Sequence, residues 1–201
     1  MLTKQEKKEI VRIVSHRNEH LKGSRLWDII EYCITLLLMM VLAFSIRSVI
    51  FEPMRVKGSS MENTLQPGDY MAVEKVSYIL APMKRGDVVI CYYPNNDDYT
   101  CVKRIIGLEG DTITIKDGYV SVNGVPLTED YVTTGLTSKH DGTYKVQTGC
   151  VFVMGDNRLV SRDSTDGMVG SIPTERVIGR VDRVLFPFSR TKKLQRIWYG
   201  I

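Results

Sequence analysis

One apolar segment near the start of the chain sets the strongest limit on its fold. Residues 32–46 carry no charge, and the 23 residues 29–51 contain only Glu31 and Arg47 near their ends. Fifteen helical residues are about 22 Å long and 23 are about 34 Å, against a hydrocarbon core of about 30 Å. The longer stretch therefore predicts a helix that spans a membrane, with the Arg47 side chain reaching the headgroups.

Two other interpretations of this segment are weaker. A helix buried inside a soluble protein is rarely apolar on all sides. A cleaved signal peptide is disfavoured by the length of the segment, by its 25-residue polar lead and by the absence of a clear small-x-small exit. Trp27 and Tyr32 stand at one boundary, where interfacial aromatic residues are common. An uncleaved signal anchor is the interpretation that remains.

The basic charge of the chain is concentrated before the apolar segment. Residues 1–25 hold seven Lys and Arg against three Glu, and this excess equals the formal net charge of +4. The balanced remainder has no electrostatic footprint for a nucleic acid, so no nucleic-acid partner is expected. Basic residues before a span favour an N-terminus in the cytoplasm.

Charge and hydropathy together divide the chain into three expected parts. A basic cytoplasmic arm over 1–25 is either a surface helix near the inner leaflet or a solvated segment. A transmembrane anchor follows over 26–51, and the rest of the chain, 52–201, is expected outside the cytoplasm. The protein is thus predicted to be a single-pass protein of the cell membrane.

Short runs rich in β-branched residues follow the anchor, separated by Gly, Pro, Asn and Asp. They predict strands over 70–76, 87–93, 100–106, 112–116, 119–122, 149–154 and 177–185. Residues 95–98 are expected to form a hairpin loop, and Asp117-Gly118 and Asn123-Gly124 are expected to form tight turns. The predicted fold class is therefore mainly β, with helix confined to the N-terminal third.

The cysteines leave one question open. Cys33 lies in the apolar segment and is most simply a small buried hydrophobe, and Cys150 has no obvious partner. Cys91 and Cys101 flank the predicted loop, so they could face each other and form a disulfide outside the cytoplasm. Two separate buried thiols are the alternative, because cross-strand geometry often forbids the bond. No Cys and His spacing suggests zinc, and no metal site is predicted.

A serine with unusual neighbours follows the anchor closely. Ser60 is preceded by Gly58, and a glycine lets the backbone approach a reacting carbonyl. A serine in a loop is ordinarily only a polar loop residue. Its position just outside a membrane anchor makes it a candidate nucleophile.

A lysine on a predicted strand is the candidate base. Lys103 and Arg104 are adjacent, so their side chains point to opposite faces, and one can enter the interior while the other reaches solvent. Lys103 has apolar neighbours, and burial can lower the pKa of a lysine from about 10.4 towards neutral pH. A neutral amine could then accept the proton of a serine. Without this context, a Lys-Arg pair is ordinarily a solvated strand face.

Three motifs follow one another along the chain. The first reads Val-x-Gly-x-Ser-Met-x-x-Thr-Leu over 56–65 and the second Lys-Arg-Ile-x-Gly-Leu-x-Gly-Asp over 103–111. The third reads Gly-Asp-Asn-Arg over 155–158 and continues to Asp163-Ser164. In this order they resemble the motifs of the bacterial type I signal peptidases. Glycine at position 58 resembles the Gram-positive form, and lysine in the second motif separates the chain from the endoplasmic-reticulum type.

The resemblance implies a membrane-bound serine endopeptidase that cleaves N-terminal signal peptides from exported preproteins at Ala-x-Ala type sites. It implies one transmembrane helix followed by a signal-peptidase-like β-sheet or barrel catalytic domain. The expected partners are signal peptides and the lipid bilayer, with the secretion translocase as a further candidate. No cofactor and no metal are expected.

The resemblance also implies roles for single residues. Ser60 is expected to be the nucleophile and Lys103 the general base, while Met61 lines the substrate pocket. Gly58 leaves backbone N–H groups, including that of Ser60, to form the oxyanion hole. In the third motif, Ser161 is expected to hydrogen-bond the lysine ammonium. Asp163 is expected to order the loop, with Arg158 or Arg162 as its partner; Asp156, Asn157 and Arg158 are expected to be structural.

Three positions depart from the family pattern: Asn63 and Glu109 replace prolines, and Thr165 replaces an arginine. They keep open a second hypothesis, a catalytically silent, membrane-tethered paralogue that binds exported chains or translocase partners. Such a paralogue would be expected to have lost Ser60 or Lys103, and both are present. A Ser/Lys peptidase of the self-cleaving repressor type is a further alternative. The membrane span and the absence of a DNA-binding domain argue against it.

Overall fold

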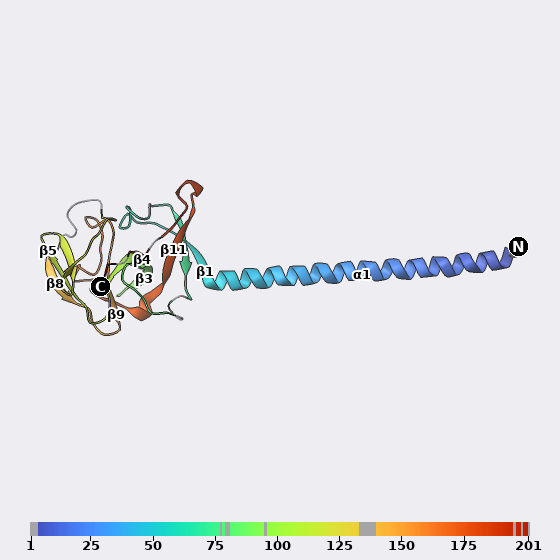
Figure 1. Ribbon diagram of the computed structural model, residues 1–201, viewed down its shortest axis with the longest axis horizontal. Helices are drawn as coiled ribbons and strands as arrows, with labels where there is room; N and C mark the ends of the chain where they lie inside the picture. The colour runs from blue at the N-terminus through green and yellow to red at the C-terminus, as the bar shows by residue number, and fades with distance from the viewer. Residues whose placement is uncertain are drawn as a thin grey trace. The chain divides into compact units, whose positions relative to one another are not determined.

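The computed structural model describes residues 4–76, 78, 81–94, 96–132, 140–194, 196–197 and 199–200. The chain divides into two compact units, Met1–Ser48 and Val49–Ile201. The first unit is helical, and the second contains all the strands that the structure describes (Figure 1).

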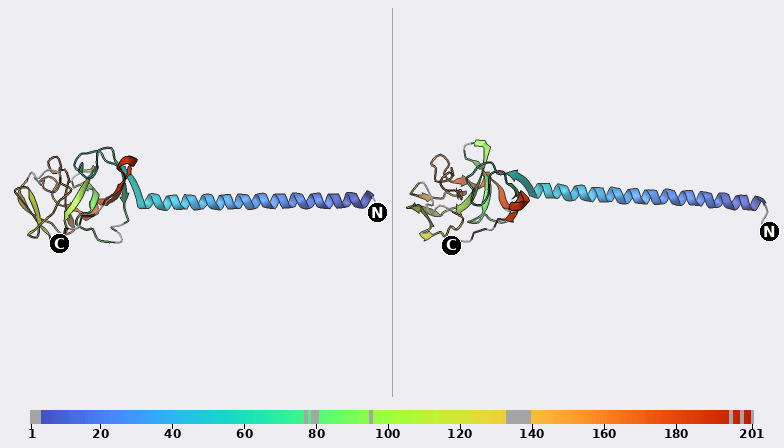
Figure 2. Two further views of the ribbon diagram at one scale, coloured as in Figure 1. Left: turned by 45° about the horizontal axis from the view of Figure 1, so that its top comes forward. Right: turned by 90° about the horizontal axis from the view of Figure 1, so that it is seen from above.

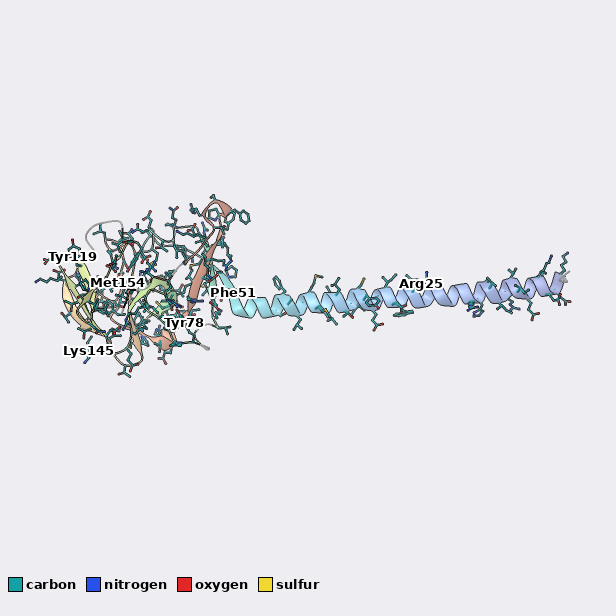
Figure 3. All side chains as sticks on the ribbon, viewed as in Figure 1. Arg25, Phe51, Tyr78, Tyr119, Lys145 and Met154 are labelled. Atoms are coloured by element: carbon teal, nitrogen blue, oxygen red, sulfur yellow. The ribbon has the colours of Figure 1, made fainter. Side chains whose placement is uncertain are left out.

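The first unit is formed by helix α1, Lys4–Ile50, which begins in the predicted basic arm, continues through the apolar segment and ends two residues beyond the unit boundary at Ser48. No proline, which would break a helix, occurs before Pro53. The stretch Arg25–Ser45 is long and apolar enough to cross a membrane, and none of it is buried within the protein. Figure 3 shows the side chains of this stretch projecting outwards around the helix. This single apolar N-terminal helix is consistent with membrane anchoring.

The second unit contains two antiparallel sheets (Figures 1 and 2). The larger has the order β1-β2-β11-β3-β4-β9-β10, with β12 paired to β11. Its strands are β1 (Phe51–Arg55), β2 (Tyr70–Glu74), β3 (Val88–Tyr93), β4 (Asn96–Gly107), β9 (Cys150–Met154), β10 (Ile172–Pro173), β11 (Val177–Phe186) and β12 (Lys192–Lys193). The smaller has the order β7-β6-β5-β8, with β5 (Thr112–Lys116), β6 (Tyr119–Val122), β7 (Val125–Pro126) and β8 (Gly142–Lys145). Two short 3₁₀ helices, Thr174–Arg176 and Phe188–Arg190, complete the described elements.

The mainly β fold confirms the predicted class, and each predicted strand is present. Asp117 and Asn123 have positive φ angles of 51° and 52°, and each is followed by a glycine that also has positive φ. These angles fit the tight turns expected between β5 and β6 and between β6 and β7. The expected loop at 95–98 is shorter, because β4 begins at Asn96, which pairs with Tyr93. Asn95 lies outside the described residues.

The central strands of the larger sheet are covered on both faces, and this positions the site. In β3, Val88 and Ile90 pack into one apolar cluster, while Val89 and Cys91 pack into another. All five side chains of β9 are buried, including Met154, which is labelled in Figure 3. A strand that is buried on both faces can hold a charged side chain away from water, provided that the charge is neutralised or paired.

Candidate active site

Ser60 lies in the loop that joins β1 to β2, and it is partly exposed. The side chains of Met61 and Leu65 are buried and anchor the loop in the core of the unit. The Leu65 N–H donates to the Met61 carbonyl oxygen at 2.6 Å, which makes a tight turn directly after the serine. The Val56 N–H donates to the Asp69 carbonyl oxygen at 2.8 Å and closes the base of the loop. Buried side chains and backbone hydrogen bonds thus hold the loop backbone around Ser60 in place.

The third motif lies directly against this loop. The Asn157 N–H donates to the Ser60 carbonyl oxygen at 2.9 Å, and Asn157 Nδ2 donates to the Ser59 carbonyl oxygen at 3.2 Å. The Asp156 N–H lies 3.4 Å from Met61 Sδ, to which it donates. The backbone is therefore held on both sides of the Ser60 side chain. These contacts give Asp156 and Asn157 positions that agree with a structural role.

Lys103 lies in β4, opposite Val89 of β3, and its side chain is 2% exposed. Burial disfavours the charged ammonium and lowers the pKa of Lys103 below its ordinary value. Negative charge on Cys101 and Asp163 raises this pKa and opposes the effect, but burial is the largest influence. A lysine in this setting is poised to act as a base.

One cavity of about 630 Å³ brings the serine and the lysine together. Gly58, Ser60 and Met61 line it from the loop after β1, and Lys103 lines it from β4. No atom lies within 4 Å of the position that a Cβ on Gly58 would take, so this glycine leaves open space beside the backbone. Four of the six predicted site residues therefore line one cavity. The described lining residues do not include the other two, Ser161 and Asp163.

Ser161 differs from expectation. Its Oγ is buried and makes no hydrogen bond with any described part of the chain, so it does not bond Lys103. The Ser161 N–H donates to the Asn157 carbonyl oxygen at 3.1 Å, and this turn directs the side chain onto Gly155. A Cβ on Gly155 would lie 2.3 Å from Ser161 Oγ and 2.6 Å from the Ser60 carbonyl oxygen. The close packing explains why position 155 needs glycine.

Asp163 orders its loop, and among the residues that the structure describes its hydrogen-bond donors are neutral groups rather than an arginine. Its Oδ2 accepts the Gly155 N–H at 3.0 Å, and its Oδ1 accepts the Thr165 N–H at 3.2 Å and the Thr165 hydroxyl at 2.8 Å. The two arginines considered as partners bind other carboxylates: Arg158 binds Glu129 at 2.5 Å, and Arg162 binds Asp166 at 3.1 Å. Short neutral donors within the loop satisfy the buried carboxylate instead.

Arg104 is buried, contrary to the expectation that it reaches solvent. Its guanidinium binds Asp156 in a bidentate pair, Nε to Oδ1 at 2.8 Å and Nη2 to Oδ2 at 2.6 Å. The two side chains are 2% and 0% exposed. Arg104 Nη1 also donates to the Gly86 carbonyl oxygen at 3.0 Å, and the Thr64 hydroxyl donates to Asp156 Oδ2. The pair thus joins the lysine strand, the serine loop and the third motif.

An aromatic ring supports this ion pair. The Arg104 guanidinium lies over the ring of Tyr131, 4.2 Å from its centroid. The Tyr131 hydroxyl donates to Glu129 Oε1 at 2.6 Å and lies 2.8 Å from the Tyr199 hydroxyl. A cation over an aromatic face is stabilised by the quadrupole of the ring. No local signal in the sequence marks Tyr131 or Tyr199, because the contacts of Tyr131 with Arg104 and with Tyr199 join segments that are distant in the chain.

The three departures from the family pattern all take part in hydrogen bonds. Two of them join separate loops: Asn63 Nδ2 donates to the Asp156 carbonyl oxygen at 3.3 Å, and Glu109 Oε2 accepts the Gly149 N–H at 2.9 Å. The third acts within one loop, where the Thr165 hydroxyl donates to Asp163. A proline at position 63 or 109 could not make these side-chain bonds. The substitutions therefore replace one means of ordering the loops by another.

Comparison with known proteins places the chain in a family. The sequence profile described as "Signal peptidase, peptidase S26" matches residues 29–186. Signal peptidase I of Bacillus licheniformis is 38% identical over 175 residues, which are 83% of this chain and 93% of that protein. Signal peptidase I T of Bacillus subtilis (strain 168) is 36% identical over 173 residues, 82% of this chain and 89% of that protein. The chain belongs to the signal peptidase family, peptidase S26.

A solved structure is also similar. The crystal structure of a signal peptidase I from Enterococcus faecalis V583 matches with 30% sequence identity and a TM-score of 0.45, covering 50% of this chain and 97% of that one. The family membership confirms the predicted resemblance to the Gram-positive signal peptidases. It likewise confirms the predicted enzyme class, a signal peptidase, and the predicted activity, the cleavage of signal peptides.

Proposed function

We propose that Ser60 and Lys103 form the catalytic dyad of this signal peptidase. The observation that carries the proposal is one cavity lined by a partly exposed serine and a buried lysine of lowered pKa. Neutral Lys103 Nζ takes the proton from Ser60 Oγ, which attacks the carbonyl carbon of the scissile bond. The Lys103 ammonium gives this proton to the leaving amine and becomes neutral again, and it then takes a proton from the water that hydrolyses the acyl-enzyme.

The oxyanion is stabilised by backbone N–H groups, among them that of Ser60. Each such donor contributes about 3 kcal/mol to transition-state stabilisation. Gly58 supports this arrangement because it adds no side chain beside the reacting carbonyl. The lysine supplies the base and the backbone supplies the oxyanion hole, so the reaction needs neither a metal ion nor a cofactor.

The substrate binds as an extended segment in the cavity. Residues of β1 line it on the sheet edge, and residues 100–103 of β4 line it as well. An extended peptide is recognised by strand-like pairing together with pockets for alternate side chains. Met61 contributes to the pocket for a small side chain, which favours Ala-x-Ala type sites on exported preproteins. The secretion translocase is a further candidate partner.

The protein crosses the cell membrane once, with the arm over 1–25 in the cytoplasm, the anchor over 26–51 and the catalytic domain over 52–201 outside. The excess of basic residues before the apolar stretch supports this orientation. Protease added to intact cells with the wall removed is expected to degrade the catalytic domain and to spare an epitope tag placed before Lys4. Degradation of the tag in intact cells, with the domain spared, would reverse the orientation.

The rate of cleavage is expected to rise with pH because the dyad needs Lys103 as a neutral amine. Burial lowers the pKa of Lys103, so the rise should be complete well below the ordinary lysine value of about 10.4. The measurement is kcat/KM against pH for a precursor that carries an Ala-x-Ala site. A profile that rises only around pH 10.4, or one that does not depend on pH, would contradict the role of Lys103.

A further inference from the structure

Two cysteines face each other beside the lysine. Cys91 of β3 and Cys101 of β4 are register partners in the antiparallel pair, and their Sγ atoms are 3.3 Å apart. Both are free thiols in the structure. The sulfur atoms of a disulfide are about 2.05 Å apart, so the bond would need only a small approach of the two side chains.

The two thiols differ in exposure. Cys91 is fully buried, whereas Cys101 is partly exposed and lines the same cavity as Ser60 and Lys103. Cys101 and Lys103 are two residues apart on one strand, so their side chains lie on the same face of the sheet. A reagent that enters the cavity therefore reaches Cys101 first and cannot reach Cys91 directly.

The two thiols also differ in pKa. A hydrogen bond from the Cys91 thiol lowers the pKa of Cys101, and the same bond raises the pKa of Cys91. The thiolate is the nucleophilic form of cysteine. The more exposed sulfur thus carries the larger share of thiolate at a given pH, and the buried thiol next to it is placed to attack the disulfide bond that this sulfur forms.

We propose that Cys101 is a modifiable thiol in the wall of the cavity and that Cys91 is its resolving thiol. Reaction with a small disulfide then ends in a Cys91–Cys101 disulfide, and the cavity is not left blocked by an adduct. The compounds that this site takes are low-molecular-weight disulfides of the kind found in oxidising compartments.

The reaction consists of two thiol–disulfide exchanges. The Cys101 thiolate attacks one sulfur of the small disulfide, whose S–S bond breaks, and the second half leaves as a thiolate. Cys91 then loses its proton and attacks Cys101 Sγ, which releases the first half as a thiolate. The two protein thiols lose two electrons and two protons, and the small disulfide is reduced to two thiols that take up both.

The two end products differ in their effect on the cavity. A Cys91–Cys101 disulfide adds no atoms and keeps the strand register in which Lys103 lies. A stable adduct on Cys101 would occupy the cavity that Lys103 also lines. Cleavage of substrate should therefore survive the first product and be lost with the second. This part of the inference rests on the proposed function.

The test treats the full-length, detergent-solubilised protein with oxidised glutathione and measures intact mass, peptide linkage and precursor cleavage. The wild type is expected to lose two hydrogen atoms, to yield a linked peptide pair containing Cys91 and Cys101, and to keep its activity within about twofold. Cys91→Ala is expected to gain one glutathione on Cys101 and to lose at least tenfold in cleavage rate. Dithiothreitol should remove the glutathione and restore the cleavage rate of this variant.

Cys101→Ala is the matched control, because Cys91 is buried and should then gain no glutathione. Each protein is compared with its own untreated sample. A stable glutathione adduct on Cys101 of the wild type, or no reaction at that residue in Cys91→Ala, would overturn the proposal that Cys101 is the modifiable thiol and Cys91 its resolving thiol. An adduct on Cys101 of Cys91→Ala that leaves cleavage intact would overturn the position of Cys101 in the substrate path. The mass measurements do not depend on the proposed dyad, so a failure of the thiol proposal can be distinguished from a failure of the proposed function.

Discussion

Ser60→Ala and Lys103→Met are each expected to abolish cleavage of a precursor with a signal peptide and to leave the β unit folded. The first change removes the nucleophile, and the second removes the only base that the proposed dyad contains. Loss of a positioned base alone costs about a hundredfold to ten-thousandfold in rate. The measurement is kcat/KM for each variant beside the wild type, with folding checked by circular dichroism and thermal unfolding.

Lys103→Met also separates catalysis from stability. The pKa of Lys103 is lower in the folded state than in the unfolded chain. The buried ammonium therefore destabilises the folded state at every pH below the folded-state pKa, and this destabilisation disappears as the pH rises towards the pKa of the unfolded chain. An apolar methionine removes the penalty, and the unfolding temperature near neutral pH should stay the same or rise. Lys116→Met, at an exposed position of β5, is the matched control and should change neither property. Full activity in Lys103→Met would rule out the dyad.

Asp156→Ala is expected to cause the largest loss of stability. It leaves the buried guanidinium of Arg104 without its carboxylate, and removal of one partner from a buried ion pair costs about 3–5 kcal/mol. The Thr64 hydroxyl loses its acceptor as well, and the serine loop loses its connection to β4. The free energy of unfolding in urea and the cleavage rate should both fall.

Two further variants test whether the loss of stability in Asp156→Ala comes from breaking a buried ion pair and not from the removal of any charged side chain. The double variant Arg104→Met with Asp156→Leu should recover much of the lost stability, because it leaves no uncompensated charge. Arg183→Met removes a more exposed ion pair, Arg183–Asp182, and should change stability by about 1 kcal/mol or less. A loss below about 1 kcal/mol in Asp156→Ala would show that the pair does not hold the site together.

Local patterns predicted the strands well. The bounds of β5 and β6 agree with the predicted ranges, because each strand alternates between the core and the surface and an Asp-Gly turn joins them. Strand β1 was not predicted, since its residues follow the apolar segment without a break and include Pro53. A proline is compatible with β1 because this strand is at the edge of its sheet.

The site itself was only partly predictable. Alternation along β4 showed that Lys103 and Arg104 point to opposite faces, but not that both faces are covered. Arg104 is buried because Asp156, 52 positions later in the chain, supplies the opposite charge. Likewise, the partner of Asp163 is its close neighbour Thr165, and the direction of the Ser161 side chain depends on its contact with Gly155. The Arg104–Asp156 pair depends on how distant segments meet, and the two local contacts depend on the exact course of the backbone in the third motif.

The most direct test of the catalytic proposal is cleavage of a purified preprotein with an Ala-x-Ala site by the detergent-solubilised wild type, beside Ser60→Ala. The product is identified by its N-terminal sequence. The account predicts a mature N-terminus directly after the final Ala with the wild type, and intact precursor with Ser60→Ala. Equal cleavage by both proteins at that site would contradict Ser60 as the nucleophile. Cleavage by neither, from folded protein between pH 7 and 10, would favour the silent paralogue.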